Sequence, residues 1–141
     1  MKADVQPTTA FEIPLQGPGG EPVDLFRTFM SHGVADLLPG RVDEKERTYT
    51  TTLAVSGARP RTVRISRARS GFARVEVEGR MLGGRATDDL RASVRRILNL
   101  DEDLSGFYAL VVDDPDLSWA TTGAGRMLRT PTVFEAVVKT I

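Results

Sequence analysis

The chain has 141 residues, the size of one ordinary domain, and its 19 basic and 19 acidic side chains leave no formal net charge. This balance argues against a simple polyanion binder, which would be basic throughout. The chain has no cysteine and one histidine, His32, which excludes disulfides, thiolate or histidine zinc sites and a thiol nucleophile. No apolar run approaches the roughly 20 residues that span a bilayer. The N-terminus has no apolar signal core, so we expect a cytoplasmic, nucleoid-associated chain with no membrane contact.

The N-terminal third predicts a leader, a strand and a helix. Residues 1–10 are expected to form a loose leader. Apolar residues alternate over residues 11–15, which predicts a strand, and Pro14 places it at a sheet edge because proline cannot donate a ladder hydrogen bond. Asp24 is a candidate N-cap for a helix that ends within residues 31–40. Four apolar residues recur after Asp24 at helical spacing: Leu25, Phe26, Phe29 and Met30.

Three further stretches alternate between apolar and polar residues. They cover residues 48–55, 62–67 and 72–78, and short turn sequences separate them. Strands at hairpin spacing predict an antiparallel meander. Together with the helices around it, the meander indicates an α+β fold.

The remaining residues predict helices. One helix begins at residues 87–89 and another near Leu104, and residues 115–120 form at most a short helical turn. The last helix is expected to have Thr130 as its N-cap and Pro131 at its first position, where the missing N–H costs nothing.

The last helix carries an apolar stripe up to the final residue. The stripe has the helical spacing i, i+3, i+4, i+7 and consists of Phe134, Val137, Val138 and Ile141. Natural termini usually end in polar sequence. We therefore expect that the chain has been cut inside a larger protein, and that this exposed helix drives self-association.

The zero net charge is the sum of unlike parts. Residues 59–85 hold eight arginines and two glutamates, whereas residues 101–116 hold six acids and no base. The arginines alternate with apolar residues, which fits a phosphate-binding face or, as we favour, the solvated face of a half-buried sheet. The acids lack the spacing of a calcium loop, so capping and turn formation explain them better, and we expect no metal or cofactor. Trp119 is expected in the core.

Three stretches, in order, resemble the helix-hairpin-helix superfamily of DNA glycosylases, the 8-oxoguanine and 3-methyladenine glycosylase type. The first, PVDLFRTFMSHG at residues 22–33, looks like the opening helix of that family and its glycine-containing pocket loop. The second, ILNLDEDLSGFYAL at residues 97–110, is similar to the segment that joins its two domains. The third, GRMLRTPTVFEAVVKTI at residues 125–141, looks like the family helix that follows an arginine- and proline-containing turn.

The resemblance implies a TATA-binding-protein-like α+β domain at residues 11–100 and the truncated start of the helical glycosylase domain at residues 101–141. In this family a damaged base is flipped out of double-stranded DNA into a pocket between the domains. The glycine-rich hairpin, the catalytic aspartate and the optional lysine of the family would lie beyond Ile141. We therefore expect no catalytic residue in this chain, and no turnover from it alone.

The resemblance also nominates binding residues. His32 and Gly33 match the pocket loop and are candidates for lining the base pocket. For His32 the alternative, which we favour, is a histidine near a helix end whose ring is satisfied by backbone carbonyls. Arg126, Arg129 and Lys139 flank the last helix and are weaker candidates for DNA contacts. Their alternative is a role as charges at the domain interface, with Arg129 paired to an acid.

Two other functional interpretations remain open. The chain could be a free-standing α+β interaction or ligand-binding domain without DNA chemistry. It could also be complemented in trans by a separate chain that supplies the helical half.

Overall fold

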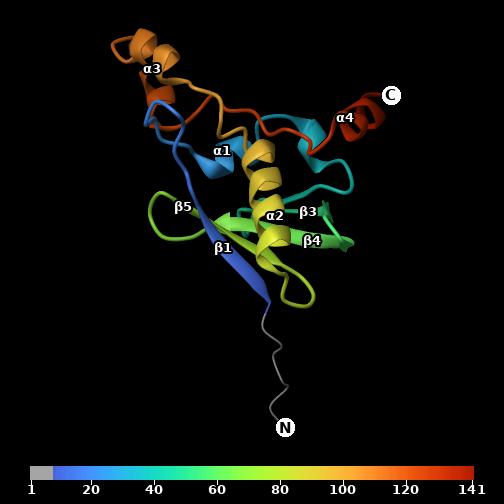
Figure 1. Ribbon diagram of the computed structural model, residues 1–141. Helices are drawn as coiled ribbons and strands as arrows, with labels where there is room; N and C mark the ends of the chain where they lie inside the picture. Colours follow the sequence, from blue (N-terminus) through green and yellow to red (C-terminus); the bar gives the residue numbers. More distant parts are fainter. Residues whose placement is uncertain (1–7) are drawn as a thin grey trace.

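The structure, a computed structural model, describes residues 8–141 and is built on an antiparallel sheet of five strands (Figure 1). In sheet order the strands are β1 (Thr9–Pro14), β5 (Phe72–Val77), β4 (Ala58–Arg67), β3 (Thr48–Val55) and β2 (Arg41–Asp43). Strands β3, β4 and β5 form the predicted meander, and β1 pairs with β5 at the edge. The α+β class is therefore confirmed.

The inner face of the sheet forms the core. Ile13 pairs with Ala73, and Val75 pairs with Ile65; all four side chains are fully buried. Successive strand residues point to opposite faces, so the residues between them, such as Arg64 and Arg74, lie on the other, exposed face. Both of these arginines are ion-paired with Glu76, which agrees with a solvated sheet face.

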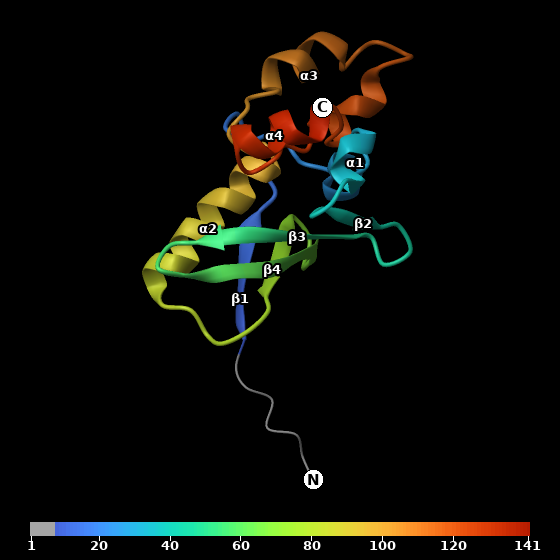
Figure 2. The ribbon, with the colours of Figure 1, turned by 90° about the vertical axis from the view of Figure 1, so that its right-hand side faces the viewer.

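Four helices and two 3-10 turns complete the fold of residues 8–141. The helices are α1 (Leu25–Phe29), α2 (Gly84–Ile97), α3 (Ser105–Val111) and α4 (Val133–Thr140), and the 3-10 turns are η1 (Gly33–Asp36) and η2 (Ser118–Thr122). Helix α2 lies against the inner face of the sheet (Figures 1 and 2), and it buries Leu90, Val94 and Ile97 there. No helix within residues 8–141 is long and apolar enough to cross a bilayer.

Helices α3 and α4 stand apart from each other at the end of the molecule opposite the start of β1 (Figure 1). Leu110 of α3 is 83% exposed, and Phe134 of α4 is 79% exposed. Helix α4 has no fully buried residue. Both helices therefore present apolar side chains to solvent.

Several element boundaries differ from the sequence-based predictions. Strand β1 begins at Thr9, inside the expected leader, because Thr9 pairs with Val77 and its hydroxyl accepts the Leu82 N–H at 2.8 Å. The rest of that leader, residues 1–7, lies outside the described residues. Strand β2 was not predicted, since its three residues are too few for a periodic signal. Helix α2 starts at Gly84 rather than at residues 87–89.

The start of the last helix was also predicted wrongly. Thr132, not Thr130, is the N-cap of α4: its backbone is extended, and its hydroxyl accepts the Glu135 N–H at 3.1 Å. The expectation that Trp119 belongs to the core is wrong as well. Its side chain is 54% exposed, and the Arg27 guanidinium lies 4.8 Å from the ring centre.

Candidate functional site

The loop after α1 is tied to a segment nearly a hundred residues later in the chain. The Ser31 hydroxyl accepts the Leu128 N–H at 2.9 Å, and His32 Nε2 lies 2.6 Å from the Leu128 carbonyl oxygen. Because a carbonyl oxygen can only accept, Nε2 carries a proton and donates it. The other ring nitrogen, Nδ1, is buried and has no hydrogen-bond partner in the part of the chain that the structure describes.

This tie forms one wall of an open groove of about 750 Å³. Helix α4, the segment before it and Arg96 at the end of α2 form the rest. The lining is mostly apolar, and its members are His32, Arg96, Leu128, Arg129, Thr130, Pro131, Thr132, Val133, Ala136 and Thr140. Apolar walls with a few polar groups are typical of sites that bind small organic ligands.

Of the two predicted pocket residues, His32 is among the groove-lining residues identified within residues 8–141, and Gly33 is not. Gly33 begins η1 directly after His32. The alternative to a pocket role was a His32 side chain that bonds to a backbone carbonyl, and this bond is present as well. The two interpretations of His32 are compatible, because the same side chain lines the groove and bonds to a backbone carbonyl.

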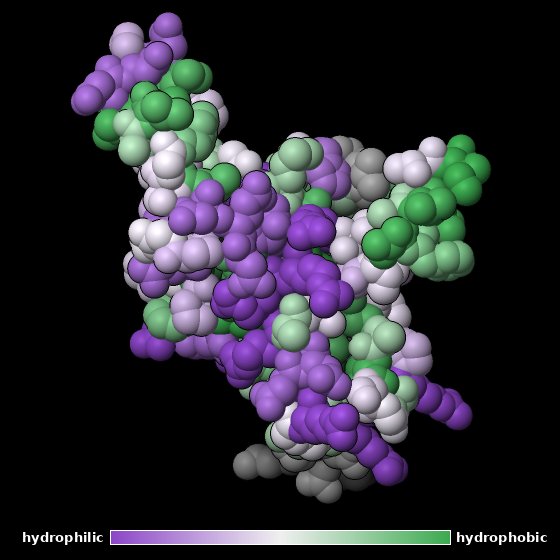
Figure 3. Space-filling model, turned by 45° about the horizontal axis from the view of Figure 1, so that its top comes forward, coloured by the Kyte–Doolittle hydropathy of each residue, from purple (hydrophilic) through white to green (hydrophobic). Residues whose placement is uncertain are grey.

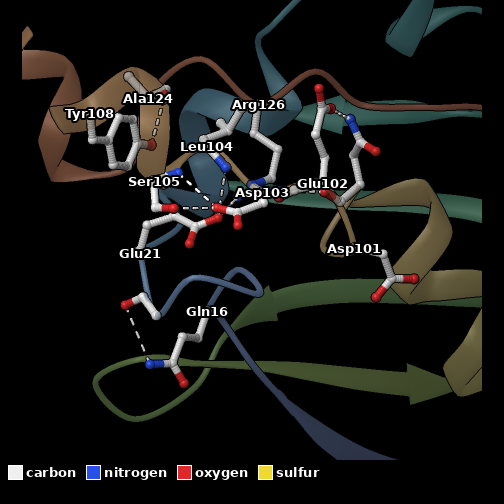
Figure 4. Close-up of polar contacts among 12 residues, drawn as sticks. Gln16, Glu21, Asp101, Glu102, Asp103, Leu104, Ser105, Tyr108, Ala124 and Arg126 are labelled. Atoms are coloured by element: carbon white, nitrogen blue, oxygen red, sulfur yellow. Dashed lines mark hydrogen bonds and ion pairs between the residues drawn. The ribbon is translucent and has the colours of Figure 1, made fainter. Parts of the chain in front are cut away.

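The Arg126 side chain is not exposed to solvent. Its guanidinium is fully buried, and Nη2 lies 3.1 Å from Glu21 Oε1, while Nη1 donates to the carbonyl oxygens of Asn99 and Glu102 (Figure 4). The expectation that Arg126 contacts DNA is therefore wrong in this conformation. Its partner Glu21 lies 105 residues earlier in the chain, so no local pattern could have predicted the pair.

Glu21 is held in its charged form. Burial raises the pKa of its carboxyl, but hydrogen bonds from backbone N–H groups, including that of Leu104 at 2.9 Å, and from Arg126 outweigh burial, so the pKa lies below its usual value. A charged Glu21 and a charged Arg126 join the loop before α1 to the segments on both sides of α3.

The other two candidate DNA contacts differ from each other. Lys139 Nζ lies 2.8 Å from Glu135 Oε1, and the Lys139 side chain is only 5% exposed, so its ammonium is largely used inside the protein. Arg129, in contrast, is exposed and lines the groove. Its N–H donates to the Ile97 carbonyl at 2.8 Å, which holds it beside the last turn of α2.

Arg96 lines the same groove and was not among the predicted site residues. It lies in the last turn of α2, next to the buried Ile97. A basic residue beside the apolar stripe of a helix was the available signal, but it is a common feature of helix C-terminal ends and therefore not specific.

Acidic residues of the two clusters accept hydrogen bonds from residues close to them in sequence. Asp103 accepts the Ser105 hydroxyl at 2.6 Å and the Ser105 N–H at 2.9 Å, and these bonds hold the pKa of its carboxyl below the usual value. Asp114 accepts the N–H groups of Asp116 and Leu117 in a turn. Within residues 8–141 no three His, Cys, Asp or Glu side chains are grouped to hold a metal ion.

Comparison with known proteins places the fold. No protein-family model and no curated protein matches the sequence. Among solved structures, a 3-methyladenine DNA-glycosylase from Archaeoglobus fulgidus matches 90% of this chain with a TM-score of 0.65 and 19% sequence identity. The match covers 42% of that chain. The protein thus has a DNA glycosylase-like fold and spans less than half the length of this solved structure.

Proposed function

From this glycosylase-like fold, we propose that the chain is the N-terminal, non-catalytic portion of a base-excision-repair DNA glycosylase of the helix-hairpin-helix superfamily. Its role is to bind double-stranded DNA and form one wall of the pocket that receives a flipped, damaged base. The observation that carries the proposal is the apolar groove beside His32, in a fold shared with a 3-methyladenine DNA-glycosylase.

The chemistry of the groove fits a base. A base that leaves the stack needs an apolar surface for its faces and hydrogen-bonding groups for its edge. Pro131, Val133 and Ala136 provide apolar surface, and the Arg129 and Thr130 side chains provide hydrogen-bonding groups.

We propose that the acid that promotes cleavage of the glycosidic bond lies outside this groove. None of the lining side chains identified within residues 8–141 is a carboxylate, so the groove holds no acid to promote cleavage of a glycosidic bond. We expect the chain alone to bind a lesion without releasing it.

A duplex with one ethenoadenine, a fluorescent alkylated adenine, tests the proposal. The fluorescence of this base is quenched in the stack, so it should rise when the protein takes the base into the groove. Binding should be tighter than to the undamaged duplex, and no free base should form.

The variant Ala136→Phe fills the groove and should abolish both the fluorescence rise and the preference for the damaged duplex. Ala109→Phe adds the same ring at an exposed position of α3 and should change neither. If the wild-type protein fails to bind either duplex, the alternative of an interaction domain without DNA chemistry is favoured.

A further inference from the structure

A polar hollow adjoins the groove at the C-terminal end of α2. Its volume is about 280 Å³, and its lining includes three arginines and one acid: Arg95, Arg96, Arg129 and Asp101. Arg96 and Arg129 line the groove as well, so these two side chains form the rim that both hollows share. Figure 3 shows hydrophilic side chains across this part of the surface, beside the apolar projection of α4.

The three arginines come from two segments that the backbone holds together. Arg95 and Arg96 belong to the last turn of α2. Arg129 is held beside that turn by its own N–H, which donates to the Ile97 carbonyl, and Arg96 Nη1 donates to the Pro131 carbonyl at 3.3 Å. These two hydrogen bonds to backbone carbonyls therefore hold the Arg129 segment beside the last turn of α2.

Acidic side chains of the described residues neutralise only part of this positive charge. Arg95 is paired with Asp101 at 2.8 Å, but Arg96 and Arg129 form no ion pair with any residue that the structure describes. Three arginines and one acid leave the hollow positive. The arginines do lie favourably near the carbonyl end of α2, but that interaction does not require a third arginine from another segment.

We infer that Arg96 and Arg129 bind a phosphate group of the DNA backbone, next to the nucleotide whose base occupies the groove. The inference rests on the proposed function, because it takes the groove as the site of the base. In a nucleotide, a flat base with apolar faces is linked to a phosphodiester. In this protein, an apolar groove wall lies next to a cationic hollow, and the two share one rim. Guanidinium groups present several donors in a planar fork and bind phosphate oxygens through paired hydrogen bonds.

The test measures DNA affinity against salt concentration for the full chain and for the double variant Arg96→Gln, Arg129→Gln. Each lost phosphate contact should reduce the slope of log affinity against log salt by about one. Affinity itself should fall by roughly tenfold or more, as expected for lost hydrogen bonds to a charged group. Arg59→Gln with Arg80→Gln removes the same charge far from the hollow, since Arg80 precedes the opposite end of α2, and should change both quantities less.

A second variant is expected to increase duplex affinity, an effect that misfolding cannot produce. Asp101 is 78% exposed at its side chain, and Asp101→Asn frees Arg95 and raises the charge of the hollow. Duplex affinity should increase. A titration of the wild-type chain with inorganic phosphate tests the anion site without DNA. Phosphate should shift the NMR signals of the Arg96 and Arg129 guanidinium N–H groups.

The outcomes separate the two claims. If the wild-type chain binds duplex and the Arg96, Arg129 variant matches the Arg59, Arg80 control, the phosphate site is wrong and the proposed function stands. If duplex does not bind but phosphate shifts the arginine signals, the proposed function fails and the anion site remains. If neither ligand has an effect, both claims are overturned.

Discussion

Glu21 and Arg126 form an ion pair whose two side chains are both buried. Their side chains are 3% and 0% exposed, and both carry several hydrogen bonds. Removing one partner of such a pair leaves an uncompensated charge in a poorly solvated place. The pair joins the loop before α1 to the segment after η2.

Glu21→Gln keeps the shape of the side chain and removes its charge. We expect the free energy of unfolding at neutral pH to fall by about 3 kcal/mol, because Arg126 is left buried without its counter-ion. Denaturant unfolding measures this. The same substitution at the exposed Glu76, which pairs with Arg64 and Arg74, should cost less than about 1 kcal/mol.

The pH dependence of stability follows from the same carboxyl. The pKa of Glu21 is lower in the folded chain than its usual value, so the stabilisation is complete above the ordinary carboxyl range. It is lost as the pH falls through the lower folded-state pKa. The Gln variant should show less of this acid-dependent loss, and an unchanged acid profile would contradict the role given to Glu21.

Single residues were predictable where their partners are local. Asp24 was expected to cap α1, and its carboxylate accepts the Arg27 N–H at 3.0 Å. The burial of Arg126 was not predictable, because its partner is remote in sequence and an isolated arginine in a loop has the same local pattern whether exposed or buried.

Helix α4 shows how a boundary error arises. A threonine before a proline is a good N-cap signal, yet here Pro131 lies outside the helix and a second threonine, Thr132, caps it. Both threonines satisfy the same local rule, and the choice between them depends on how residues 128–132 are held against α2. The groove wall is therefore set by contacts that sequence periodicity does not encode.

The two threonines give a direct comparison. Thr132→Ala should destabilise α4 by about 1 kcal/mol, because the Glu135 N–H loses its acceptor. Hydrogen exchange of the α4 amides measures this locally. Thr130→Ala should leave α4 protection almost unchanged, and equal effects of the two substitutions would restore the sequence-based boundary.

The molecule as a whole divides into a packed layer and two projections. The sheet and α2 were predictable in outline, since their alternating and helical patterns are long and the turns between strands are short. The projections were predictable only as helices. Their positions depend on the ties at Glu21 and Leu128, which join residues about a hundred positions apart.

The projection formed by α4 should make the protein self-associate as its concentration rises. Val133, Phe134 and Ile141 are between 79% and 100% exposed, and adjacent apolar side chains of this kind favour association. Phe134→Lys with Val138→Lys should yield a monomer in sedimentation velocity. Thr52→Lys with Ala54→Lys adds the same charge on the exposed sheet face and should not, so association that persists equally in both variants would implicate another surface.

One oxygen atom, Glu21 Oε1, receives both the Leu104 N–H and the Arg126 guanidinium. The chain between these residues, an excursion that includes α3 and η2, starts and ends at this oxygen, and within it Trp119 contacts the Arg27 guanidinium of α1. Closing such an excursion costs only slightly more entropy when it is longer. The excursion is therefore a natural place for insertions or for a grafted module, because its length can change while the groove beside His32 keeps its shape.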